Sequence, residues 1–183
     1  CSFFSSQQLN TKLNFYKHSL GTQCYKGVLN FDLRDNNSEL NIKAGNKFKN
    51  NSIYHLECNV CHYGFNSRSH TLFRSVNEGN SKCIIYGNLN VGMDVSLIDA
   101  KLYCNSLLLS DSAEVMFVPE LNIDNDNVKC SHGATIGQLN NTFIFYLMSR
   151  GLSKKECIAI LIDSFLLKSM SKNNVFSSIL NKN

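Results

Sequence analysis

The chain has 183 residues, of which 43% are hydrophobic and 17% are charged, and its formal net charge is +4. This length suffices for one domain with a substantial core plus a smaller appendage, and the composition excludes a disordered chain, a collagen and a coiled coil. No run of Lys or Arg is interleaved with aromatic residues, so we expect no nucleic-acid partner.

Hydropathy and cysteine usage indicate the kind of compartment in which we expect the chain. No apolar run reaches about 18 residues, so we expect a soluble chain without a membrane partner. The eight cysteines are spread evenly, unlike those of small disulfide scaffolds, which favours a reducing compartment. Cys1 in place of Met indicates processing or a fragment, and Cys1 followed by Ser2 also fits the first residue of a mature bacterial lipoprotein.

Short apolar or alternating runs, separated by Asn, Asp, Gly and Ser, fill the chain from about residue 13 to residue 139. They predict β-strands, most clearly at residues 27–33, 82–91, 95–110 and 113–123. The hairpin dipeptides Asn-Gly and Asp-Gly are missing, and polar corners lead directly into new strands. No exact repeat is visible, but this pattern suits a stacked solenoid at least as well as a sandwich.

The last two predicted strands alternate with a period of two. On the first, the residues of one face are Val115, Phe117, Pro119, Leu121 and Ile123. After a turn at 124–127, the residues that share a face on the second are Val128, Cys130, His132, Ala134 and Ile136. The opposite face of that strand carries Lys129, Ser131, Gly133 and Thr135. We therefore expect Cys130 and His132 to lie next to each other and to face inward.

Beyond Gly137 the apolar spacing becomes helical and predicts helices at residues 142–150 and 154–170. Gly151 suits the end of the first helix, and Ser153 with Glu156 has the form of a capping box that begins the second. The apolar stripe of the second helix consists of Ile158, Leu161, Ile162, Phe165 and Leu166. For residues 171–183, with a short apolar patch at 175–180, we expect a weak third helix or a frayed end.

The segment Cys58-Asn59-Val60-Cys61-His62 has the spacing of a c-type haem attachment site. Such a protein needs export, whereas this segment lies among strand-like runs, so we interpret the match as coincidental. A zinc site would need a second ligand pair at similar spacing, and the other cysteines and histidines supply none. The acids Asp94, Asp99 and Asp111 are scattered and fit turns better than a paired general acid and base. Phosphate-loop and hydrolase motifs are missing too.

Cys130 and His132 remain as candidates for a site. A thiolate and a neutral imidazole on one face of a strand can both bind iron or an intermediate cluster. Two ordinary interior residues of a β-rich body would show the same spacing, so the spacing alone leaves both interpretations open.

The stretch around these two residues resembles the SufB/SufD family of iron-sulfur cluster assembly proteins. The segments that carry the resemblance follow one another in order, at residues 105–110, 113–115, 119–123, 128–139 and 145–152. Within the family, Cys130-Ser131-His132-Gly133-Ala134-Thr135 is similar to the SufD branch, whereas SufB-like chains more often carry His-Glu-Ala-Thr there. The resemblance covers residues 13–165 and weakens toward the N-terminus, where the Asp-His and Pro-His-Cys elements common before Asn66-Ser67-Arg68 are absent.

This resemblance implies a right-handed parallel β-helix at residues 1–136, truncated at its N-terminus, followed by a small helical domain at residues 137–183. Family members are longer, so the chain looks like a C-terminal portion or a reduced form. The family implies a non-catalytic scaffold without a tightly bound cofactor, located in a bacterial cytosol or a plastid stroma.

The resemblance also implies partners and residue roles. A SufB-like subunit would pair with the β-helix as a heterodimer, and a SufC-like ATPase would dock on the helical domain through Phe145, Tyr146, Arg150 and Gly151. A homodimer is an alternative. His132 would act with a partner cysteine as a transient ligand of iron or of the nascent cluster, with Cys130 as a neighbouring, secondary residue.

Two functions of other classes stay open at this stage. One is a structural or binding β-solenoid without cluster chemistry. The other is a c-type electron carrier with haem bonded at Cys58 and Cys61 and ligated by His62.

Overall fold

The computed structural model describes residues 2–7, 11–20, 24–167 and 169. These residues form mainly β structure followed by two helices, as the strand and helix periodicities predict. The helices are α1 (Asn141–Ser149) and α2 (Lys154–Leu167). The strands are β1 (Ser2–Gln7), β2 (Lys12–Leu20), β3 (Cys24–Leu33), β4 (Glu39–Phe48), β5 (Ile53–His62), β6 (Arg68–Asn77), β7 (Lys82–Val91), β8 (Ile98–Leu108), β9 (Glu114–Ile123) and β10 (Val128–Gln138).

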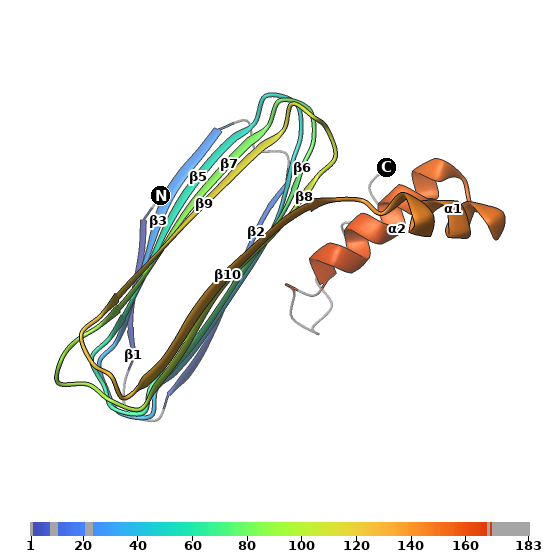
Figure 1. Ribbon diagram of the computed structural model, residues 1–183. Helices are drawn as coiled ribbons and strands as arrows, with labels where there is room; N and C mark the ends of the chain where they lie inside the picture. Colours follow the sequence, from blue (N-terminus) through green and yellow to red (C-terminus); the bar gives the residue numbers. More distant parts are fainter. Residues whose placement is uncertain (1, 8–10, 21–23, 168, 170–183) are drawn as a thin grey trace.

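The strands stack into a flattened parallel β-solenoid with two walls (Figure 1). Sheet A has the order β1-β3-β5-β7-β9, and sheet B has the order β10-β8-β6-β4-β2. All strand pairs within the two sheets are parallel. Each coil therefore contributes one strand to sheet A and the next strand to sheet B, which confirms the solenoid rather than the sandwich.

The coils follow a repeat that the sequence does not show by identity. Cys24 pairs with Ile53, which pairs with Lys82, and equivalent positions in these coils are 29 residues apart. Later coils are slightly longer, with spacings of 31 residues between Ser75 and Ser106 and 32 between Asn90 and Asn122. The register keeps inward positions stacked on inward positions despite these insertions.

Alternation along each strand places the apolar residues between the two sheets. In β5, Tyr54, Leu56, Cys58 and Val60 are buried, while the residues between them are partly exposed. The same pattern in the neighbouring coils joins them into one core that runs the length of the solenoid. Burial of this core is the main stabilising contribution, since each coil can cover its apolar side chains only against the next.

Asparagine holds the outside of the coils in register. The Asn59 amide donates to Asn30 at 2.8 Å, and the Asn88 amide donates to Asn59 at 2.7 Å, which forms a ladder along sheet A. Asn37 and Asn66 occupy equivalent corners with positive φ angles of 59° and 51°, a backbone region that Asn tolerates better than most residues. The frequent use of Asn is therefore structural at these positions.

Both helices begin and end close to the predicted residues. The Asn140 side chain accepts a hydrogen bond from the Thr142 amide at the start of α1, and Gly151 follows α1 with a φ of 96°. At the start of α2, Glu156 accepts hydrogen bonds from both the amide and the hydroxyl of Ser153, as the capping box predicts. The expected third helix at residues 171–183 lies outside the described residues.

Helix α2 packs on the outer side of sheet B. Ile162 and Leu166 form a small apolar cluster with Val76 of β6. The Arg74 guanidinium donates to the Phe165 carbonyl oxygen at 2.5 Å and lies 4.8 Å from the Phe165 ring. These contacts connect the C-terminal part of α2 to the centre of sheet B.

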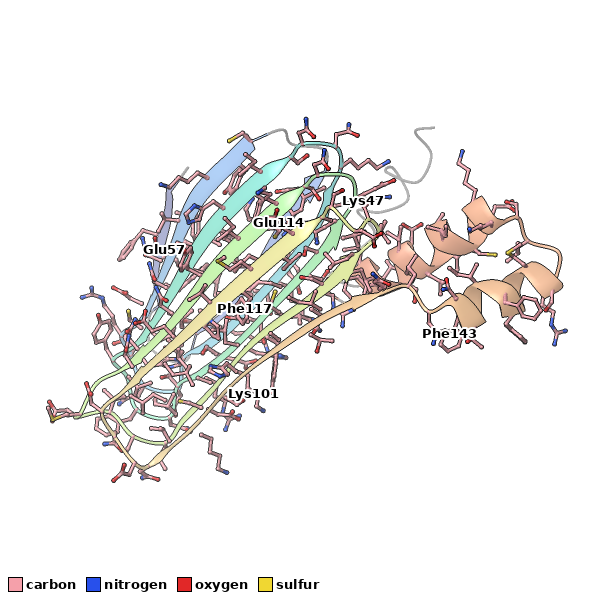
Figure 2. The ribbon with its side chains drawn as sticks, turned by 45° about the horizontal axis from the view of Figure 1, so that its top comes forward. Lys47, Glu57, Lys101, Glu114, Phe117 and Phe143 are labelled. Atoms are coloured by element: carbon pink, nitrogen blue, oxygen red, sulfur yellow. The ribbon has the colours of Figure 1, made fainter. Side chains whose placement is uncertain are left out.

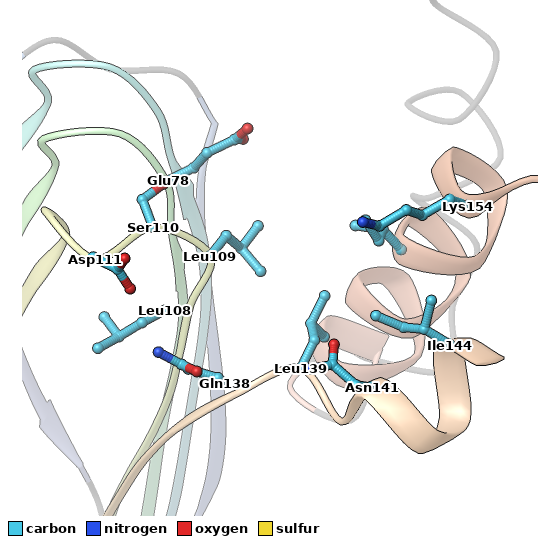
Figure 3. A pocket seen from close by; sticks show the side chains of 11 residues that line it. Glu78, Leu108, Leu109, Ser110, Asp111, Gln138, Leu139, Asn141, Ile144 and Lys154 are labelled. Carbon is cyan, nitrogen blue, oxygen red and sulfur yellow. The ribbon is translucent and has the colours of Figure 1, made fainter.

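A cavity of about 310 Å³ separates the start of the helical region from the solenoid. Figure 3 shows Glu78 and Asp111 on the solenoid side and Ile144 and Lys154 on the helix side. Within the described residues, no helix is long and apolar enough to span a membrane.

Candidate functional site

The segment that contains Cys130 and His132 forms β10, the last strand of sheet B. In the register with β8, Cys130 pairs with Ala100 and His132 pairs with Leu102. Ala100 and Leu102 are buried in the core, so Cys130 and His132 belong to the inward row of their sheet. The structure thus confirms that the two residues share the inward face of one strand.

Cys130 and His132 differ in exposure, although both lie in the last strand of the solenoid. Cys130 is half-buried and packs against the core, whereas His132 is exposed. Among the described strands, β10 pairs only with β8, and the chain then leaves the solenoid for α1. An inward-facing residue of this last strand is consequently open to solvent, which makes the His132 imidazole accessible to a ligand.

The surroundings of Cys130 disfavour its thiolate. Burial raises the pKa of the thiol, and the nearby Asp99 carboxylate raises it further. A protonated thiol is a poor metal ligand, so Cys130 needs a metal ion or a base to remove its proton before it can bind. Cys130 is therefore the secondary ligand candidate of the pair.

Strand β9 provides the opposite wall of this last coil. Its partly buried residues all lie on the inward face and are Val115, Phe117, Pro119, Leu121 and Ile123. Phe117, labelled in Figure 2, packs with its neighbours against the core. Apolar residues thus line one wall of the last coil, and the inward row with Cys130 and His132 lines the other.

The Cys58-Cys61-His62 segment cannot form a haem or metal site in this fold. It lies within β5, where Cys58 points into the core and Cys61 points outward, with its sulfur 3.5 Å from the Asn90 amide nitrogen. Residues three apart on a strand face opposite sides of a sheet, so the two thiols cannot bond one macrocycle. The alternative of a c-type electron carrier is therefore wrong, and so is a zinc site based on this pair.

His62 has a structural role that sequence reasoning missed. It is buried, and its two ring nitrogens lie 2.7 Å from the Ser67 hydroxyl and 2.8 Å from the Ser69 hydroxyl. Burial lowers its pKa to about 4, so the ring is neutral at physiological pH. Both serines follow the corner after β5, with Ser67 directly before β6 and Ser69 within it.

The scattered acids occupy unrelated places. Asp94 and Asp111 lie in turns, as expected, whereas Asp99 lies in β8 and not in a turn. Asp99 forms an ion pair with Lys101 at 3.6 Å. Groups of three or more His, Cys, Asp or Glu side chains suitable for a metal ion are absent from the part of the chain that the structure describes.

The four residues assigned to ATPase docking lie in or directly after α1. Phe145 is 73% exposed and Tyr146 is 53% exposed, and the Arg150 guanidinium lies 5.2 Å from the Tyr146 ring. Gly151 ends the helix. Two further large apolar side chains of α1, Phe143 and Met148, are also exposed, so α1 presents more apolar surface than sequence reasoning assigned to it.

Comparisons with known proteins agree with this architecture. The profile described as "SUF system FeS cluster assembly, SufBD core domain" matches residues 3–165, which is most of the chain. The chain belongs to the SufBD family. The match includes the solenoid and both helices, so Cys130, His132 and α1 all lie within the family's core domain.

Individual SufBD proteins match about half of the chain. The iron-sulfur cluster assembly protein SufD of Escherichia coli is 35% identical over 97 residues, which are 53% of this chain and 23% of that protein. A SufBD family protein of Synechocystis is 39% identical over 94 residues (51% and 21%), and one of Archaeoglobus fulgidus is 39% identical over 103 residues (56% and 27%). The aligned segments thus span roughly a quarter of each relative.

Proposed function

We propose that this chain is a non-catalytic scaffold subunit in iron-sulfur cluster assembly, with the nascent cluster as its cargo. In this proposal a SufB-like subunit pairs with the end of the solenoid formed by β9 and β10, and a SufC-like ATPase docks on the helical domain through α1. ATP hydrolysis belongs to the ATPase, and the setting is a bacterial cytosol or a plastid stroma. Membership of the SufBD family supports the general role.

The observation that carries the proposal is the exposure of His132 on an inward row. A partner that covers the end of the solenoid would bury this row, and among the described strands the outer edge of β10 is unpaired and can accept a further strand. The imidazole would then be enclosed between two subunits. A second copy of this chain could cover the same end, which is the homodimer alternative.

The chemistry of the enclosed row suits transient binding. A neutral imidazole offers iron one nitrogen ligand of intermediate softness, and a thiolate from the partner would supply the soft ligand that iron-sulfur clusters prefer. Cys130 would join only after it loses its proton, because burial and Asp99 raise its pKa. This chain alone would supply only part of the ligands of the nascent cluster, which is consistent with a cluster that is later released.

Helix α1 supports the second contact of the proposal. Its exposed apolar residues Phe143, Phe145, Tyr146 and Met148 all belong to one helix of nine residues. Arg150 adds a cation beside the Tyr146 ring. Aromatic residues and arginine are typical anchors of protein interfaces.

The test is the His132→Ala variant in a complex reconstituted with SufB-like and SufC-like proteins. We expect cluster formation, followed by visible absorption, to fall at least tenfold while the complex still assembles. His55→Ala is the matched control, because His55 lies on the outward face of β5 beside Tyr86 and away from the last coil. Unimpaired cluster formation in His132→Ala would refute the role of His132.

A further inference from the structure

The two outer faces of the solenoid carry opposite charge. On sheet B the outward cations are Lys12, Lys43, Lys47, Arg68, Arg74, Lys101 and Lys129, and the outward acids are Glu39 and Asp99. On sheet A the outward cations are Lys26 and Lys82, and the outward acids are Asp32, Glu57, Glu114 and Glu120. In Figure 2, Glu57 and Lys101 mark the two sides. The small net charge therefore conceals a basic face on sheet B.

At the start of the sheet B strands, the charges in the first row of outward residues largely neutralise one another. Neighbouring strands present Lys12, Glu39, Arg68, Asp99 and Lys129 side by side, so the sign alternates from strand to strand. Lys12 and Glu39 form an ion pair at 2.6 Å. Opposite charges on adjacent strands stabilise the sheet, and this row has little excess charge to offer a partner.

The next two rows contain two lysines and no acid of their own: Lys101 is ion-paired with Asp99 of the first row at 3.6 Å, and Lys43 forms no ion pair with a described carboxylate. His70 pairs in register with Lys101, and Lys43 pairs with Leu72, which pairs with Tyr103. The pKa of His70 is lowered first by burial and then by Lys101 and Lys43, while Asp99 acts in the opposite direction. We call Lys43, His70, Leu72, Lys101 and Tyr103 the cationic patch. It combines two lysines with two apolar side chains and a neutral histidine.

We propose that the cationic patch is a docking surface for an acidic protein partner. Carboxylates of that partner would pair with Lys43 and Lys101, and an apolar side chain would contact Leu72 and Tyr103. The charge of the patch supports this occupant, because complementary charge steers association and fixes orientation. This contact is separate from the end of the solenoid and from α1, so it does not depend on the scaffold role.

The aromatic rings of the patch favour a protein over a nucleic acid. The Tyr103 and His70 rings pack edge to face, with centroids 6.1 Å apart and an interplanar angle of 85°. The Tyr103 ring also lies against Gly133, where a Cβ atom would come within 3.0 Å of it. Bases bind single-strand platforms by stacking on free ring faces, which Tyr103 does not provide. The acids Glu39 and Asp99 in the adjacent row would also repel a continuous phosphate backbone.

The experiment uses the whole chain and a fluorescein-labelled poly-glutamate peptide, with binding followed by anisotropy. We expect Lys43→Glu with Lys101→Glu to weaken binding at least tenfold, and the milder pair Lys43→Gln with Lys101→Gln to weaken it less. The matched control is Lys49→Glu with Lys155→Glu, which makes the same charge change at exposed residues outside the patch. The control pair should lose little affinity, and 0.5 M salt should abolish binding.

A second readout locates the contact. Poly-glutamate should raise the pKa of His70, measured by NMR titration, because its carboxylates oppose Lys43 and Lys101. An unchanged His70 pKa, or an equal loss of affinity in the control pair, would overturn the proposal. Tighter binding of a single-stranded oligodeoxynucleotide, lost in the same patch variants, would overturn the choice of an acidic protein.

Discussion

His62 and His132 show how the position of a residue in the solenoid decides what its imidazole can do. Both belong to inward rows, but His62 is covered by further coils and bonded to two serines, whereas His132 lies in the last strand and is exposed. The first ring is committed to structure and the second is accessible. The difference arises from the number of coils that cover each residue and not from residue type.

His62 should make folding sensitive to mild acid. Its pKa of about 4 lies below the ordinary value of 6.5, so the folded state holds the neutral ring while the unfolded state takes up a proton below pH 6.5. The contribution of the neutral His62 ring to the free energy of unfolding is therefore fully present above pH 6.5. It is lost as the pH falls toward 4, by at most about 1.4 kcal/mol per pH unit. His62→Gln should remove this part of the acid sensitivity.

Urea unfolding at pH 7 and pH 4.5 checks the His62 prediction. Carboxylates elsewhere also respond to acid, so the informative quantity is the stability lost by the natural chain minus the stability lost by His62→Gln. His55→Gln serves as a control at a partly exposed histidine. If the natural chain and His62→Gln lose the same stability on acidification, the low pKa of His62 is not linked to folding.

At the scale of the element, strand β5 separates residues that are close in sequence. Cys58 and Cys61 lie on opposite faces of this strand, one in the core and one toward solvent. The pattern Cys-x-x-Cys-His has functional meaning only where the backbone brings both sulfurs to one side, as in a loop or a helical turn. The strand period therefore removes the chemistry that the spacing alone would permit.

This arrangement predicts unequal reactivity of the two thiols. Burial raises the pKa of Cys58 to about 12, so Cys58 is both covered and protonated, whereas Cys61 is partly exposed. In the folded protein at pH 7.5 we expect iodoacetamide to label Cys61 at least 100-fold faster than Cys58, since Cys58 reacts only through unfolding. Mass spectrometry of peptides after timed labelling measures both rates. Labelling in urea, where both thiols should react at equal rates, is the reference. Similar labelling rates of Cys58 and Cys61 in the folded chain would contradict the strand register of β5.

The sequence permitted several elements of this fold to be predicted because their signals are local. The strand of residues 82–91, the capping box of Ser153 and Glu156, and the shared face of Cys130 and His132 depend on neighbours within a few residues. The 29-residue register was missed because the coils share the alternation of apolar positions and not residue identities. The contact between Arg74 and Phe165, 91 residues apart, and the exposure of His132 depend on which elements meet in space.

At the scale of the whole molecule, the two docking surfaces proposed for the scaffold role lie on different parts of the chain. One is the open end of the solenoid at β9 and β10, and the other is the exposed side of α1 (Figure 1). Helix α2 packs against α1 and contacts sheet B through Val76 and Arg74. Partners on the two surfaces could therefore bind at the same time.

Single substitutions should separate the two surfaces. Ile136 lies on the inward row of β10 and is 46% exposed, so Ile136→Glu would place an unpaired carboxylate in a contact that covers the end of the solenoid. Burying such a charge costs several kcal/mol, and we expect at least tenfold weaker pairing with the SufB-like subunit and unchanged binding of the SufC-like ATPase. Phe145→Glu on α1 should have the reverse effect, and affinity measurements with each partner alone compare the two.

Val118→Glu on the outward face of β9 and Ile160→Glu on α2 are the matched controls, because both residues are exposed and lie outside the two surfaces. Loss of both partners in either variant would show that the surfaces are not independent, and loss of neither would refute their assignment.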